Sequence, residues 1–263
     1  MTYETVTYSL ENGVATIGLN RPDKLNPFNR QMVKDTTNAL KAANRDPEAR
    51  CVLLTGNGRG FSSGQDLMEA AQGFASGKSK AGDSLRKSYH PLIDQIFNSS
   101  QPIVCAINGI AAGIGMSISL TTDIRIASDQ AAFTLGFSKI GLVPDGGANW
   151  ILPRMIGYSR AYQIALTSEK ISAAQALEWG IVNQVVPHDQ LMEVAQATAT
   201  KIASGPTLAF ALTKKAMLRG LSQTLEENLD YEAHLQNVAG ASEDSREGVM
   251  AFIEKRPAAY KGK

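Results

Sequence analysis

Two glycine-rich segments and one carboxylate are the residues of this chain whose types and spacing point to chemistry. The segments run from Gly60 to Leu67 and from Gly109 to Gly115, and the carboxylate is Asp145, inside the run Phe137 to Gly147. Glycine turns let a backbone come close to a ligand and direct its N–H groups at it. Two such turns and one acid predict an oxyanion-binding site paired with a proton carrier.

The first segment permits a second interpretation. Its letters Gly60-Phe61-Ser62-Ser63-Gly64 match G-x-S-x-G, the nucleophile elbow of α/β-hydrolases, and Ser62, Asp145 and His188 follow in Ser–Asp–His order. Short patterns of this kind arise by chance, and His188 lies in a connection typical of a surface turn. We therefore favour a tight turn with a backbone function, and keep the triad as an alternative.

The second segment resembles a dinucleotide fingerprint in its spacing, with Gly109, Gly113 and Gly115 before an apolar helix. No acidic residue ends a second strand at the distance that nicotinamide binding requires. The glycines are expected to serve close helix packing in part. The N–H of Ile114 would then lie at a helix N-terminus, where the dipole favours negative charge.

Asp145 itself has a structural alternative. It lies between a strand-like apolar run and a helix-like run, so it could cap the helix that follows. Asp66 and Asp123 also lie at the ends of predicted elements, and we interpret them as caps or members of ion pairs. Phe137 is interpreted as core or pocket wall.

Strands and short helices alternate over most of the chain. The predicted strands are 3–9, 14–19, 51–55, 102–107, 124–127, 132–135 and 184–186, and the predicted helices of this part are 29–43, 114–121, 149–155, 159–166 and 172–179. Residues 67–98 begin and end as helix around a polar, glycine-rich loop at 73–84. The pattern predicts an α/β core over 1–190.

The rest of the chain is purely helical in pattern, with helices at 190–203, 206–219, 223–239 and 243–254. We predict a helical oligomerisation region at 191–263, because its apolar faces have no sheet of their own to cover. Lys255 and Arg256 follow the last helix, where cations suit the dipole without any ligand.

Composition excludes several classes of protein. The chain has 263 residues, 43% of them hydrophobic, and a net charge of +1, which gives no electrostatic basis for binding nucleic acid or an anionic membrane. No apolar run approaches the ~20 residues of a membrane helix. Cys51 and Cys105 lie in apolar runs and indicate buried thiols in a reducing compartment. We expect a cytoplasmic protein without a metal site or a covalently bound cofactor.

Several motifs together resemble those of the enoyl-CoA hydratase/isomerase, or crotonase, superfamily, in order and over nearly the whole chain. They are Asn20 to Asn26, Gly60 to Leu67, Pro102 to Gly109, Asp123-Ile124, Ala173 to Val182, and Glu247-Gly248 through Lys255-Arg256-Pro257. The resemblance implies a crotonase-like spiral of ββα turns, an all-helical C-terminal trimerisation region, and assembly into trimers or dimers of trimers. It also implies an acyl-CoA thioester as substrate, with coenzyme A as part of it.

The resemblance implies roles for individual residues. The oxyanion hole would be the N–H groups of Gln65 and Ile114, the latter just after Gly113. Coenzyme A would be held by Lys24, Leu25 and the Ser63–Leu67 loop, which includes Asp66 and Leu67, and Phe137 would line the acyl site. Phe252 and Lys255 match tail residues that, in the superfamily, approach the coenzyme A of a neighbouring subunit.

Departures from the hydratase pattern favour isomerisation. The hydratases carry two glutamates where this chain has Ser117 and Phe137, whereas Asp145 matches an acid of the enoyl-CoA isomerases. The run Phe137 to Gly147 is most similar to the branch that isomerises 1,2-epoxyphenylacetyl-CoA in phenylacetate degradation. The sequence therefore predicts isomerisation of that thioester or of a 3-enoyl-CoA. A hydratase, or a non-catalytic CoA-binding subunit, is the alternative.

Overall fold

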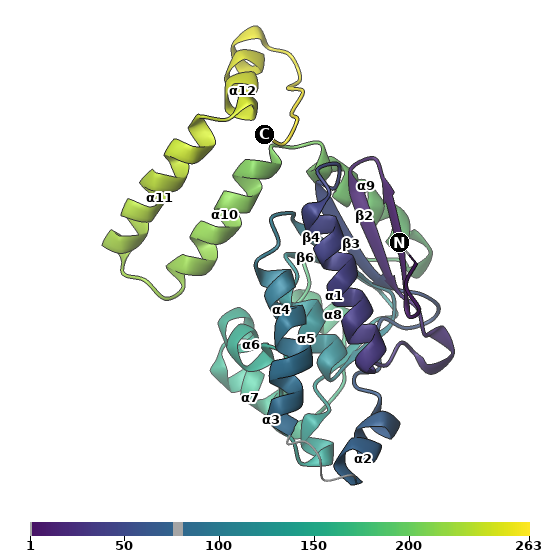
Figure 1. Cartoon of the computed structure of the whole chain (residues 1–263). Coiled ribbons are helices and arrows are strands. Elements are labelled where there is room, and N and C mark those ends of the chain that lie inside the picture. Colours follow the sequence, from purple (N-terminus) through teal and green to yellow (C-terminus); the bar gives the residue numbers. More distant parts are fainter. Residues whose placement is uncertain (1, 76–80) are drawn as a thin grey trace.

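The computed structural model describes residues 2–75 and 81–263 (Figure 1). Its centre is a six-stranded sheet in the order β1-β2-β3-β4-β6-β9. The strands are β1 Val6–Glu11, β2 Val14–Leu19, β3 Cys51–Gly56, β4 Ile103–Ile107, β6 Ile124–Ser128 and β9 Gln184–Val186. β1 and β2 pair as an antiparallel hairpin, and every later neighbour in this sheet is parallel.

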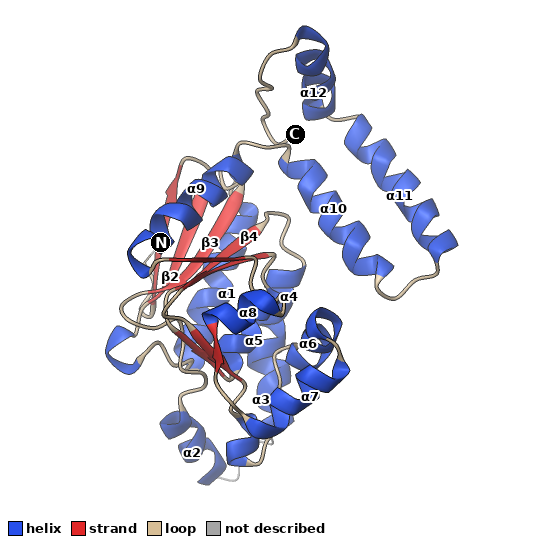
Figure 2. Ribbon diagram, turned by 180° about the vertical axis from the view of Figure 1, so that it is seen from behind, coloured by secondary structure: helices blue, strands red, loops and turns tan. Residues whose placement is uncertain are grey.

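Both faces of the sheet are covered, which explains why its central strands are apolar throughout. Successive side chains of a strand point to opposite faces. In β3, Val52 and Leu54 join the cluster packed against α1 (Arg30–Arg45) and α4 (His90–Phe97), whereas Cys51 and Leu53 join the cluster of α9 (Leu191–Ala203). Figures 1 and 2 show these helices on opposite sides of the sheet.

The position of α9 affects the expected division of the chain. Its small residues Ala195, Ala199 and Ala203 recur every four positions and pack on the sheet with none or almost none of their surface exposed. The helices that leave the core therefore begin after α9, and the division into 1–190 and 191–263 stays a prediction.

A second, three-stranded sheet completes the spiral. It consists of β5 Ile110–Ala112, β7 Ala132–Thr134 and β8 Ile171–Ser172 in that order. Successive turns pass from the large sheet to the small sheet and then to a helix, as in β4, β5 and α5 (Ile114–Thr121). This is the crotonase-like ββα arrangement that the sequence predicts. Residues 110–112 were expected to be part of a turn, but they form a strand because they pair with β7.

Further helices complete the core. They are α2 Leu67–Ala75, α3 Ala81–Ser84, a π-helical turn Leu85–Tyr89, α6 Ala148–Ile156, α7 Tyr158–Thr167 and α8 Ala173–Glu178. The loop expected at 73–84 is wrong where it can be compared, because α2 continues to Ala75 and α3 begins at Ala81. Residues 76–80 of that prediction lie outside the described residues.

The C-terminal helices form an arm that projects from the core (Figures 1 and 2). It consists of α10 Thr207–Gly220, α11 Leu225–Gly240 and α12 Glu243–Glu254. The last residues return to the base of the arm, where Arg50 donates to the carbonyls of Tyr260 (2.9 Å) and Gly205 (2.6 Å). Among the described residues, no helix combines the length and apolar character needed to cross a bilayer.

Candidate active site

The two glycine-rich segments meet in the fold. Ser62 and Ala111 form a parallel bridge, in which the Ser62 N–H donates to Ile110 and the Ala112 N–H donates to Ser62, both at 2.9 Å. Beyond this bridge Gly64 and Gly113 face each other. A Cβ on Gly64 would lie 2.9 Å from the Ala112 carbonyl oxygen. Only glycine permits this approach, because Gly64 also has a φ of +101°.

The amides that follow these glycines are those of Gln65 and Ile114. Neither donates a backbone hydrogen bond within the part of the chain that the structure describes. The Ile114 amide lies at the start of α5, and its helix packs tightly on the first segment, since a Cβ on Gly115 would lie 2.6 Å from that of Ser62. Two unpaired N–H donors therefore lie on neighbouring turns, the arrangement that stabilises a developing oxyanion.

The turn that carries Asp145 packs against the same helix. A Cβ on Gly146 would lie 2.5 Å from Cδ1 of Ile114 and 2.9 Å from Cβ of Ser117. The strand expected at 132–135 is confirmed as β7, and the residues between it and Asp145 include a 3-10 helix, Phe137–Ile140. Tertiary packing thus places the turn that carries Asp145 against the helix that begins at Ile114, the residue of the second amide.

The alternative role of Asp145 as a helix cap is wrong. The N-cap of α6 is Gly147, and no side chain caps this helix. Oδ1 of Asp145 is buried and has no hydrogen-bond partner among the described residues. Burial raises the pKa of Asp145 to about 6, because the charged form loses hydration and gains no compensating partner.

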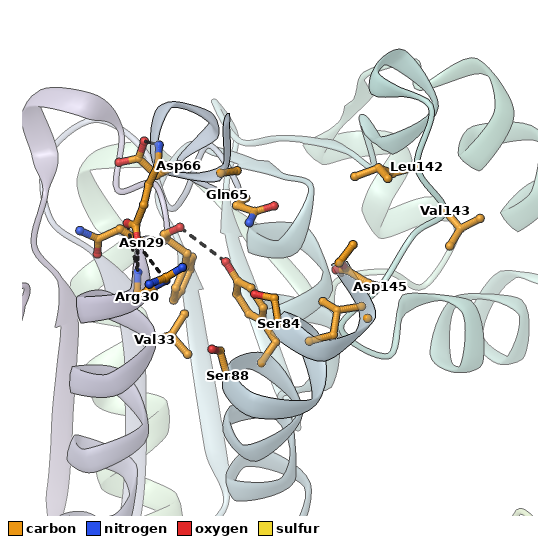
Figure 3. Close-up of a pocket in the computed structure, with 17 residues that line it drawn as sticks. Asn29, Arg30, Val33, Gln65, Asp66, Ser84, Ser88, Leu142, Val143 and Asp145 are labelled. Carbon is orange, nitrogen blue, oxygen red and sulfur yellow. Dashed lines mark hydrogen bonds and ion pairs between the residues drawn. The ribbon is translucent and has the colours of Figure 1, made fainter. Parts of the chain in front are cut away.

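A cavity of about 310 Å³ joins Gln65 and Asp145. Figure 3 shows Asn29, Arg30 and Val33 on one side of it and Leu142, Val143 and Asp145 on the other. Three carboxylates of the described chain line this cavity, and two are ion-paired, Asp66 with Arg21 at 2.9 Å and Glu69 with Arg30 at 3.5 Å. Asp145 is the third, and no ion pair within the described residues includes it.

The residues expected to hold coenzyme A lie on one loop surface, apart from those of the tail. The Ser63 N–H donates to Leu25 at 2.8 Å, and the Ser63 hydroxyl donates to the Lys24 carbonyl at 3.3 Å. Lys24 and Ser63 are exposed, as is Leu67 at the start of α2. Asp66 holds this loop to Arg21, which confirms its interpretation as an ion-pair member.

Asn26 is a structural centre of this region that sequence reasoning did not single out. It is fully buried, and its side chain donates to the carbonyls of Asn57 (2.9 Å) and Gly60 (2.8 Å) and accepts from the Arg21 N–H (2.8 Å). Its φ of +53° suits asparagine better than most residues. Its presence in the motif Asn20 to Asn26 was the only available signal.

Phe252 and Lys255 do not join the other predicted site residues. Phe252 is 86% exposed on α12, and Lys255 ends that helix in a left-handed conformation. Figures 1 and 2 both place α12 at the opposite end of the molecule from α2 and α3, which border the cavity. These residues can reach a cavity of this kind only in another copy of the chain.

The hydrolase triad is not assembled. Ser62 is fully buried, and its hydroxyl donates to Asn26 at 2.8 Å and accepts from the Gly64 N–H at 3.2 Å. His188 is exposed, and its Nδ1 lies 3.0 Å from the hydroxyl of Ser128. The serine therefore shapes the glycine turn, which is the interpretation that the sequence favoured.

Known proteins share this architecture and sequence. A family model described as enoyl-CoA hydratase/isomerase matches residues 9–263. The chain belongs to the enoyl-CoA hydratase/isomerase family. It is 42% identical to 1,2-epoxyphenylacetyl-CoA isomerase of Escherichia coli strain K12, over 99% of both chains. It is 43% identical to a protein of Rhodobacter capsulatus named as a probable enoyl-CoA hydratase, over 100% of both chains.

A solved structure extends the likeness to three dimensions. The crystal structure of an enoyl-CoA hydratase from Bacillus anthracis matches with a TM-score of 0.90 and 33% identity, over 99% of this chain and 100% of the other. The chain is thus an enzyme of the enoyl-CoA hydratase/isomerase family with its fold. The relatives carry both isomerase and hydratase names, so the local chemistry must separate the two activities.

Positions 117 and 137 carry no acid in this member of the enoyl-CoA hydratase/isomerase family. Ser117 is fully buried, and its hydroxyl donates to the Gly113 carbonyl at 3.3 Å. Phe137 is 7% exposed and belongs to the apolar core. Neither side chain can position and activate a water as a carboxylate does.

Proposed function

We propose that this enzyme is an acyl-CoA isomerase in which Asp145 moves a proton between carbons of the acyl group. The observation that supports this most is the unpaired Asp145, which lines the same cavity as Gln65 and lies on a turn packed against Ile114. A base that shuttles a proton needs an ionised carboxylate near neutral pH without a basic partner that would hold it. Because the pKa of Asp145 is raised to about 6, this carboxylate is ionised at neutral pH and binds the proton that it takes more strongly than an ordinary aspartate would.

In the proposed reaction, the C–H bond next to the thioester or along the conjugated chain breaks, and the proton passes to Asp145. The electron pair delocalises to the thioester oxygen, where the Gln65 and Ile114 N–H groups stabilise the negative charge. Asp145 then returns the proton to a different carbon, so that the double bond moves and nothing is oxidised or reduced. Donors fixed at an oxyanion contribute roughly 3–4 kcal/mol each to such a transition state.

The relatives support a proposal for the substrate class. The 42% identity to 1,2-epoxyphenylacetyl-CoA isomerase supports that thioester, whose isomerisation would rearrange bonds of the epoxide ring as well as transfer a proton, whereas a 3-enoyl-CoA needs the proton transfer alone. We propose that coenzyme A enters as part of the substrate, along the loop surface of Lys24, Leu25, Ser63, Asp66 and Leu67. Turnover of both thioesters, measured beside crotonyl-CoA, tests the assignment, and isomerisation should exceed hydration at least 10-fold.

Hydration of an enoyl-CoA is the second candidate. It is favoured by the Rhodobacter capsulatus relative, whose printed name gives this activity at 43% identity. Serine and phenylalanine at positions 117 and 137 oppose it. Hydration of crotonyl-CoA at a rate on the order of 10² per second, which ordinary enzymes reach, would replace isomerisation as the assigned function.

We also propose assembly into a trimer or a dimer of trimers through the arm. Nine large apolar side chains of the arm are at least 40% exposed, namely Met217, Leu221, Leu225, Leu229, Val238, Val249, Met250, Phe252 and Ile253. A neighbouring copy would cover them, and cyclic symmetry would bring Phe252 and Lys255 toward a neighbour's coenzyme A. Light scattering on the full-length protein tests the mass.

A further inference from the structure

Tyr89 is a buried phenol on the wall of the cavity that Asp145 lines. Only 5% of its side chain is exposed. Its hydroxyl lies 3.5 Å from the carbonyl oxygen of Phe28, which already accepts a 2.9 Å hydrogen bond from the Asp66 N–H. A hydrogen bond of 3.5 Å is weak, and a buried hydroxyl without a good acceptor is costly. The one hydrogen bond that the described chain gives this phenol is therefore long, and its O–H can turn to a better acceptor in the cavity.

The backbone around Tyr89 explains how this side chain reaches the cavity. Tyr89 ends the π-helical turn Leu85–Tyr89, which is inserted between α3 and α4. A π turn adds a residue to the helical repeat and rotates the following side chains, and such turns are frequent at functional sites. The next helix, α4, begins at His90 with a proline in its first turn, which fixes the register after the insertion.

The phenol remains a donor at every physiological pH. Burial raises the pKa of Tyr89 well above its usual range, and the nearby carboxylate of Asp145 raises it further. A hydroxyl that keeps its proton cannot act as a base in this cavity. It can donate to an acceptor on a bound molecule, and Asp145 lines the same cavity as a group that takes protons.

We propose that Tyr89 makes this enzyme selective for acyl groups that carry an oxygen of their own, such as an epoxide, a ring ether or a hydroxyl, by donating a hydrogen bond to that oxygen. The proposal rests on the proposed function, in that the acyl group occupies the Asp145 cavity. The two amides stabilise the thioester oxygen, so this second donor serves a different atom. Among known relatives, the 1,2-epoxyphenylacetyl-CoA isomerase acts on a thioester of this oxygenated kind.

Binding measurements separate this inference from the isomerase reaction. The probes are 2-hydroxyphenylacetyl-CoA and 2-methylphenylacetyl-CoA, which match in size and differ in the oxygen. Titration calorimetry on the wild-type protein should show roughly tenfold tighter binding of the hydroxylated thioester, the usual effect of one good hydrogen bond. Equal affinities would overturn the proposal, whatever the enzyme's turnover.

Tyr89→Phe removes only the phenolic hydroxyl and should bring the ratio of the two affinities close to one. Tyr8→Phe is the matched control, because Tyr8 lies on β1 away from the cavity lining, and it should keep the wild-type ratio. Ser84→Ala and Ser88→Ala remove the other cavity hydroxyls of this segment. If a serine variant lost the preference for the hydroxylated thioester and Tyr89→Phe kept it, the assignment to Tyr89 would be contradicted.

Two further measurements keep the test decisive. If Tyr89→Phe does not fold, 3-fluorotyrosine at position 89 strengthens the donor and should raise the ratio, and an unchanged ratio would contradict the proposal. In turnover, Tyr89→Phe should lose roughly tenfold in kcat/KM with 1,2-epoxyphenylacetyl-CoA and less than about twofold with a 3-enoyl-CoA. An equal loss with both substrates would mean a purely structural role, whereas Asp145→Asn alone tests the proton transfer.

Discussion

The cavity and the arm differ in the groups that they leave open. At the cavity, the Asp145 carboxylate and the Gln65 amide lack a partner within the described chain and the Tyr89 phenol has only a weak one, while two apolar lining residues, Leu142 and Val143, are 40% and 76% exposed. On the arm Glu247 is paired, because it accepts from Arg256 at 2.6 Å and from the Ala259 N–H at 2.8 Å, although Oε1 of Gln223 and Oδ1 of Asn228 are buried without a partner among the described residues. Many apolar side chains of the arm are left open, and Leu225 and Phe252 are 75% and 86% exposed.

The two carboxylates show the difference most directly. The hydrogen bonds from the Arg256 guanidinium, and then from the Ala259 amide, lower the pKa of Glu247 to about 2, whereas burial alone raises that of Asp145 to about 6. Unpaired polar groups in a cavity are satisfied by a polar ligand, and uncovered apolar groups by another protein surface. This difference supports the proposals that the cavity binds the substrate and that the arm binds a second copy of the chain.

The largest expected effect comes from the unpaired carboxylate. Asp145→Asn keeps the shape of the side chain and removes the base, so turnover should fall about 10²–10⁴-fold. Steady-state kinetics of the isomerase reaction measure it, with circular dichroism to check the fold. Asp129→Asn is the control, since Asp129 is an exposed aspartate of another turn and should be nearly silent. Near-normal turnover of Asp145→Asn would remove its proposed role.

Loss of the close contact between the two turns should come next. Gly64→Ala places a Cβ 2.9 Å from the Ala112 carbonyl oxygen and strains a φ of +101°, which displaces the Gln65 amide. Turnover should fall about 10²–10³-fold, the effect of losing one oxyanion donor. Gly180→Ala shares a positive φ of +77° but meets no atom within 4 Å, so it controls for strain alone. Equal losses in both variants would exclude a specific role for the contact.

The arm should respond through assembly. Leu225→Asp puts a charge on an apolar side chain that is 75% exposed, at a helix start that tolerates acids. If a neighbour buries this leucine, losing about 2 kcal/mol of burial weakens association roughly 30-fold, before the cost of the charge. Light scattering at micromolar concentration measures the mass, and Glu226→Ala is the control. A full-length protein that is monomeric, or an unchanged mass of Leu225→Asp, would contradict the proposed interface.

The smallest effect concerns pH. Asp145 must be ionised to accept a proton, and its pKa is raised to about 6, so kcat/KM should rise with pH up to about 6 and then level off. At pH 5 the rate should be about a tenth of the plateau, because one pH unit below the pKa leaves about a tenth of the base. If kcat/KM instead fell only near pH 4, the Asp145 carboxylate would be solvated, and its contrast with Glu247 would be weaker.

Much of the fold was visible in the sequence because local patterns govern it. The apolar run Cys51–Gly56 forms the expected buried strand, and the regular apolar spacing after residue 190 gives the expected helices. The strand at Ile110–Ala112 was missed because a three-residue segment between two glycines is typical of a turn. Only its pairing with β7 makes it a strand. The helix Ala81–Ser84 was missed for a similar reason, since its residues have weak local preference.

For the site, the sequence determined the residue types: two glycine turns that direct amides, one acid, and no acid at positions 117 and 137. Tertiary structure decided which of these groups lie together and which of them have no hydrogen-bond partner. Asp145 is unpaired and buried next to Gly146, which packs on α5, and Tyr89, at the end of a π turn, lines the same cavity. Burial and pairing depend on contacts between segments distant in sequence, and local patterns carry no record of those contacts.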